Sequence, residues 1–126
     1  MPREKIEVVR VADLEEGDST RGMVRAKAFE AKDLLVARSQ IFRGAKSGWH
    51  HHGKSEVYGF LVSGKLRIEY GEDEKDSVAV EEGYFFHIPV GLVHRDVNPD
   101  QDQVAVVVNV FLGEGPSVVN VRRPSA

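Results

Sequence analysis

Short segments with the composition and alternation of β-strands recur along the whole chain. They are Ile6–Arg10, Val24–Phe29, Leu34–Phe42, Glu56–Val62, Lys65–Tyr70, Ser77–Val80, Tyr84–Ile88, Val93–Val97, Gln103–Leu112 and Ser117–Val121. Turn-forming pairs such as Ser63-Gly64 and Glu82-Gly83 separate them. No window keeps the apolar spacing of a helix over three turns, so only one short helical turn is expected, at residues 13–16. Many short strands at this spacing predict an all-β sandwich or barrel.

Length and composition limit the remaining choices. The chain has 126 residues, 41% of them hydrophobic and 29% charged, which predicts one packed domain over residues 1–126. The net charge is −3, and the only basic doublet is Arg122–Arg123, so we expect no nucleic-acid partner. The longest apolar run, Val104–Val108, is too short to cross a bilayer, so we expect no membrane partner and a cytoplasmic location. Because the chain has no cysteine, any metal must be held by nitrogen and oxygen atoms.

The strand at Val104–Phe111 differs from the others in having two mostly apolar faces. One face of a barrel strand lies in the core, so the other must be covered by the N-terminal strands or by another subunit. This pattern predicts a homodimer.

Histidines gather in one extended segment. Alternate side chains of a strand share a face, so His50 and His52 can point together while His51 points away. Gly53 permits a turn, after which Glu56 can return a carboxylate to the same place.

A further histidine follows a tight turn in a distant segment. Pro89 and Gly91 specify a turn between two strands, and His94 comes just after it, where a barrel strand re-enters the interior. A third imidazole is thereby brought in from far away in sequence.

These two segments resemble the two motifs of the cupin superfamily, G-x5-H-x-H-x3/4-E-x6-G and G-x5-P-x-G-x2-H-x3-N. The second motif, at residues 83–98, is matched by Gly83, Pro89, Gly91, His94 and Asn98, and the first, at residues 44–64, by Gly44, His50, His52 and Glu56. The spacing from Glu56 to Gly64 is one residue longer than the pattern, which indicates either a bulge in the intervening strand or a different ligand register.

The resemblance implies a small single-domain cupin with a double-stranded β-helix, or jelly-roll, barrel. It also implies one divalent transition metal ion (Mn, Fe, Ni, Zn or Cu), with His50, His52, Glu56 and His94 as the ligands. The ligand set does not choose among these metals.

Aromatic residues on the strands near these motifs are candidates for contact with a substrate. Tyr58, Phe60, Phe86 and His87 are the predicted substrate-binding residues, with Val108 as a further lining residue. The alternative for the aromatic residues is barrel packing, and for His87 a hydrogen-bonded role without ligation. Arg95 and Asp96 are interpreted as a surface pair, and Asn98 as a residue that fixes a turn.

Two hypotheses for function remain open. One is a metal-dependent enzyme, with a dioxygenase as the leading example, that acts on a small oxygenated or carboxylated molecule. The other is a non-catalytic module that binds or senses a small ligand. No second carboxylate or nucleophilic serine is evident beside the predicted ligands, so catalysis would depend mainly on the metal.

Overall fold

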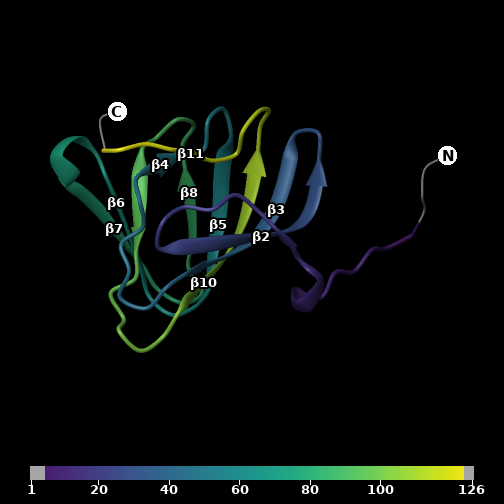
Figure 1. The fold of residues 1–126 in the computed structure, drawn as a ribbon, viewed down its shortest axis with the longest axis horizontal. Helices are drawn as coiled ribbons and strands as arrows, with labels where there is room; N and C mark the ends of the chain where they lie inside the picture. The colour runs from purple at the N-terminus through teal and green to yellow at the C-terminus, as the bar shows by residue number, and fades with distance from the viewer. Residues whose placement is uncertain (1–4, 124–126) are drawn as a thin grey trace.

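Two antiparallel sheets make up the computed structural model, which describes residues 5–123 (Figure 1). The first sheet has the order β1 (Glu15–Glu16), β2 (Met23–Ala31), β3 (Leu34–Ile41), β10 (Ala105–Leu112), β5 (Glu56–Ser63) and β8 (Phe85–Ile88). The second has the order β11 (Val119–Asn120), β4 (His50–His51), β9 (His94–Val97), β6 (Leu66–Tyr70) and β7 (Asp76–Val80). Two 3-10 turns, at Val11–Asp13 and Glu72–Glu74, are added to the strands.

The chain passes back and forth between the sheets. From β7 onward each successive strand lies in the sheet opposite to that of the strand before it. This alternation wraps the two sheets into a double-stranded β-helix and confirms the predicted all-β jelly-roll barrel. The part of the chain that the structure describes contains no helix with the length and apolar character needed to cross a bilayer.

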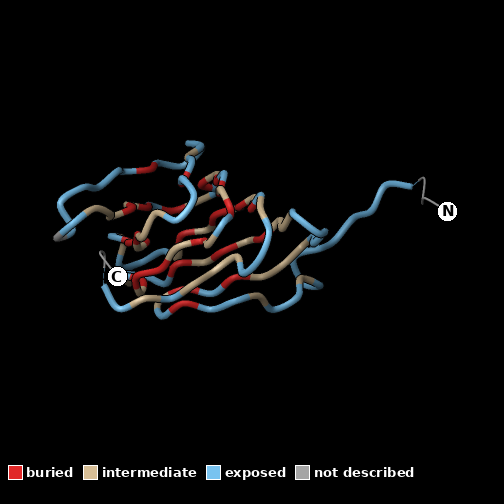
Figure 2. The backbone as a smooth tube through the Cα atoms, turned by 90° about the horizontal axis from the view of Figure 1, so that it is seen from above, coloured by how far each residue is buried: buried red, intermediate tan, exposed pale blue. Residues whose placement is uncertain are grey.

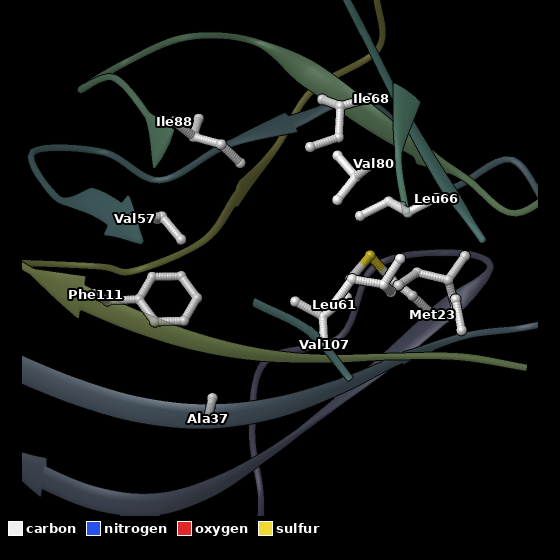
Figure 3. Packing of buried hydrophobic residues seen from close by; sticks show 12 residues of the cluster. Met23, Ala37, Val57, Leu61, Leu66, Ile68, Val80, Ile88, Val107 and Phe111 are labelled. Carbon is white, nitrogen blue, oxygen red and sulfur yellow. The ribbon is translucent and has the colours of Figure 1, made fainter. Parts of the chain in front are cut away.

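The core lies between the sheets, where the buried residues of both gather (Figure 2) and their inward side chains meet (Figure 3). Along β10 every second residue is buried, which places Val107, Asn109 and Phe111 inside the barrel and Val108 and Val110 outside. The expectation that Val108 lines the interior was therefore wrong. Ile68 and Leu66 of β6 face them from the second sheet (Figure 3). Alternation along the strands therefore decides which side chains can reach a site inside the barrel.

The N-terminal prediction was wrong. Residues 6–10 form no strand, and Ile6 and Val8 are 92% and 84% exposed. Alternation is not sufficient for a strand, because its backbone groups also need a neighbouring strand. The helical turn was also displaced, since the 3-10 turn ends at Asp13, and Glu15–Glu16 pair instead with β2.

Candidate metal centre

Three histidines meet inside the barrel. His50 of β4 lies opposite His94 of β9 in the sheet register, and His52 follows β4 directly. One nitrogen from each ring lies within 4.8 Å of the other two. The exposed fractions of His50, His52 and His94 are 0%, 4% and 0%, so water has little access to this cluster.

Backbone carbonyls fix the orientation of all three rings. Nδ1 of His50 lies 2.9 Å from the oxygen of Gly48, and Nδ1 of His94 lies 2.9 Å from the oxygen of Leu92. Nδ1 of His52 lies 2.8 Å from the oxygen of Ser117. A carbonyl only accepts hydrogen bonds, so each Nδ1 donates a proton, and in a neutral ring Nε2 then carries a lone pair. The three lone pairs point into the same small space.

These lone pairs lack the partners that a buried acceptor requires. Nε2 of His52 lies 3.3 Å from Nε2 of His94, and two acceptors at this distance cannot form a hydrogen bond with each other. Nε2 of His50 is buried and has no hydrogen-bond partner among residues 5–123. Since an unpaired buried acceptor is destabilising, the arrangement fits a cation that receives all three lone pairs.

Burial also keeps the rings in the form that binds metals. It lowers the pKa of His50 and His94, and it lowers the pKa of His52 to about 2. For His50 and His52 the charge of a protonated His94 would add to this effect. Neutral imidazole is the ligating form, so the cluster needs no deprotonation at neutral pH.

Glu56 lies outside this cluster. Its neighbour Val57 is 1% exposed and points inward, so Glu56 points to the outer face of β5. There its carboxylate lies 2.8 Å from Nε2 of His87 and accepts a 3.4 Å hydrogen bond from the Tyr58 hydroxyl. The structure therefore brings together three of the four predicted ligands.

The extra residue between Glu56 and Gly64 accounts for this placement. A bulge does occur in β5, because Val106 lies opposite Ser63 while Val107 lies opposite Leu61. The bulge does not bring Glu56 inward, however. Counting back six intervening residues from Gly64 gives position 57, which holds Val57, and a shift of one residue changes the face of a strand.

A different carboxylate lies beside the cluster. Asp96 is two residues beyond His94 on β9, is 8% exposed, and has Oδ2 at 3.5 Å from Nε2 of His50. Arg95 points outward, where its guanidinium stacks on Trp49 at 4.5 Å and pairs with Glu69. The interpretation of Arg95 and Asp96 as a surface pair was therefore wrong for Asp96. Strand alternation from His94 was the signal that could have found it.

Of the predicted substrate-binding residues, Phe86 reaches the interior. It lines a cavity of about 20 Å³ beside the histidines, and a Cβ atom at Gly59 would collide with its ring. Tyr58 pairs with His87, and Phe60 with Phe85, on the outer face of the first sheet. The same cavity is also lined by Asp96 and by three polar residues that the sequence did not point to: Arg25, Ser39 and Asn109.

A sequence model of the cupin domain family matches residues 39–111, more than half of the chain. The chain is a cupin. This match contains the three buried histidines and both motif segments. No curated protein sequence matches this cupin.

Solved structures share the fold at low sequence identity. The polyketide cyclase RemF from Streptomyces resistomycificus is 18% identical, with a TM-score of 0.74 over 94% of this chain and 87% of that chain. KdgF from Halomonas sp. is 22% identical, with a TM-score of 0.66 over 84% of this chain and 94% of that chain. Oxalate decarboxylase from Bacillus subtilis, whose Mn(II) centres have been studied, is 19% identical, with a TM-score of 0.72 over 89% of this cupin and 31% of that chain. These likenesses show the fold alone.

Proposed function

We propose that this cupin binds one divalent transition metal ion through the Nε2 atoms of His50, His52 and His94. The supporting observation is the convergence of three buried lone pairs, each on a ring whose Nδ1 is already bonded to a backbone carbonyl. Imidazole ligands suit zinc, copper, iron and nickel better than manganese. The Mn(II) centres of the Bacillus subtilis oxalate decarboxylase nevertheless keep manganese among the metals to test.

We further propose that the metal-loaded cupin is an enzyme acting on a small oxygenated or carboxylated molecule, with an oxygenase reaction as the first to test. The bound ion would supply a Lewis acid, or a redox centre if it is iron, copper, manganese or nickel. The protein would supply a site with little access to water and the carboxylate of Asp96, which lies close enough to the cluster to exchange a proton with a ligand there.

The narrow cavity favours a second candidate, a non-catalytic binding module. A cavity of about 20 Å³ has room for only one or two water-sized groups. In this alternative the ion holds a small ligand or stabilises the barrel without turnover.

Metal content and turnover test both proposals. Elemental analysis of the wild-type protein and of the alanine variants of His50, His52 and His94 should show a single ion that each variant largely loses. Undiminished metal in two of the variants would refute the site. The metal-free protein would then be loaded with iron(II), manganese(II), nickel(II) or zinc(II) and screened with small enols, diols and keto acids for oxygen uptake or product. Tight ligand binding without turnover would support the binding module.

We also propose that the cupin forms a homodimer through the outer face of the first sheet. Apolar side chains are exposed on this face, and Phe85 (81%), Tyr58 (45%) and Val62 (46%) are examples. Val106, Val108 and Val110 of β10, the strand next to β5, lie on the same face. A specific interface here should bury more than about 1,000 Å² in total. A monomer in light scattering at micromolar concentration would contradict this proposal.

A further inference from the structure

A buried arginine faces the histidine cluster from the opposite sheet. Arg25 lies on β2, is 5% exposed, and lines the same cavity as His50, His52 and His94. It also lines a wider pocket of about 390 Å³, whose other charged residues are Lys27 and the acidic Glu16, Asp18 and Glu30. Arg25 therefore stands between the histidines and a space large enough to admit a small molecule.

The hydrogen bonds of Arg25 leave part of its guanidinium available. Nη1 donates to Oγ1 of Thr20 at 2.8 Å and to the backbone oxygen of Asp18 at 3.2 Å, and Nη2 reaches the sulfur of Met23 at 3.7 Å. Within residues 5–123, no hydrogen bond from Nε is found and no carboxylate lies within 4.0 Å of the guanidinium. The carboxylates of Asp96 and Asp18 attract this charge without touching the guanidinium. Arginine is almost never fully buried unless it is directly paired, so the guanidinium can still pair with an anion.

Arg25 belongs to a polar row on the otherwise apolar inner wall of the first sheet. Arg25 lies directly opposite Ser39 in the register of β2 and β3. Asn109 of the adjacent strand β10 donates from Nδ2 to Oγ of Ser39 at 3.0 Å. Both Ser39 (1% exposed) and Asn109 (8%) are buried, and both line the cavity that holds the histidines. The row thus offers a cation, a hydroxyl and an amide to a ligand at that position.

The charges around the cavity favour an anion as that ligand. A divalent ion on the histidines would add two positive charges to that of Arg25, against the negative charges of Asp96 in the cavity and of Asp18 beside Arg25. A planar carboxylate matches the fork of an arginine, and its two oxygens are no more than the one or two water-sized groups for which the cavity has room.

We propose that the polar row of Arg25, Ser39 and Asn109 binds the carboxylate of a small ligand, with one carboxylate oxygen toward the guanidinium and the other toward the three Nε2 atoms. The proposal rests on the metal site proposed above and names its ligand class. Arg25 is then the residue that selects carboxylates over neutral molecules of the same shape.

The test compares acetate with acetamide, which has nearly the same shape but no charge. The protein is loaded with cobalt(II), and binding is followed by the visible absorption of the ion and by the thermal midpoint of unfolding. Wild-type protein should bind acetate at least about tenfold more tightly than acetamide. Arg25→Gln should abolish this preference while retaining cobalt, and Arg25→Lys should restore part of it. Ser39→Ala, which keeps the arginine, should lower the affinity for acetate by about two- to tenfold.

Controls separate this inference from the metal proposal. Lys27→Gln removes a positive charge from the wider pocket only, so it should leave acetate binding unchanged. If wild-type protein takes up no cobalt, the metal proposal fails. The role of Arg25 is then decided on metal-free protein, by comparing the rise in thermal midpoint that acetate causes in wild-type protein and in Arg25→Gln. Equal affinity of the wild-type protein for acetate and acetamide would overturn the inference. An equal loss of acetate affinity in Lys27→Gln and Arg25→Gln would also overturn it.

Discussion

Replacing Asp96 with asparagine should lower the affinity of the protein for divalent metal by about 10- to 100-fold, a typical cost for a carboxylate that supports a metal site. An ion bound about 2.1 Å from Nε2 of His50 lies at most about 5.6 Å from Oδ2 of Asp96, because Nε2 and Oδ2 are 3.5 Å apart. At that separation the attraction between a doubly charged ion and a carboxylate is about 6 kcal/mol at an effective dielectric of about 20. The expected loss is smaller because asparagine keeps a carbonyl dipole and a similar shape.

Glu56→Gln is the matched control for this change. It also removes one negative charge, but from a carboxylate on the outer face that is 43% exposed and lies against His87. We expect less than about a twofold change in metal affinity. Competition for zinc and cobalt against a chromophoric chelator measures both variants on metal-free protein. A larger loss for Glu56→Gln than for Asp96→Asn would show that Glu56 turns inward to ligate the metal, which would refute the reasoning from strand faces.

Three further predictions concern stability and assembly. Metal-free protein should lose stability as the pH falls below about 6.5, because the three buried histidines have lowered pKa values in the folded state and the unfolded state takes up protons first. Each histidine should lower the free energy of unfolding, measured by urea titration, by up to about 1.4 kcal/mol per pH unit. A urea midpoint of unfolding that does not change between pH 5.5 and 7.5 would contradict this. Val108→Lys should convert a dimer into a monomer in light scattering, whereas Ala79→Lys on the second sheet should not. Gly59→Ala should lower the free energy of unfolding by about 1–3 kcal/mol, because the added methyl group collides with Phe86, while Gly48→Ala, whose nearest contact would be 3.5 Å, should have a smaller effect.

Local patterns were sufficient for much of the fold. Alternation and turn residues predicted most of the strands, and the i, i+2 spacing of His50 and His52 predicted that both point inward. Asn98 fixes a turn as predicted, since its Oδ1 accepts a 2.9 Å hydrogen bond from the backbone N–H of Asp100, while its Nδ2 donates to the backbone oxygens of Ile41 and Gln103. Each of these features depends on a few neighbouring residues.

The features that were missed depend on pairing between distant segments. The face of Glu56 is set by the register of β5 against β10, which the local sequence does not specify. Arg25 precedes His50 by a whole strand and a loop, and only the closure of the barrel brings the two to one cavity. The segment at residues 6–10 alternates like a strand but finds no partner within residues 5–123.

The hydrogen bond from His52 to Ser117 has a consequence for the order of folding. The carbonyl that selects the tautomer of His52 belongs to a residue 65 positions later in the chain, just before β11, and β11 in turn pairs with β4 beside His50. On the ribosome, the imidazole cluster therefore cannot take its final form until residues 117–120 have emerged and docked. An ion captured earlier would be held by fewer fixed ligands and would exchange more rapidly. Docking of β11 is thus the step that completes the proposed metal site.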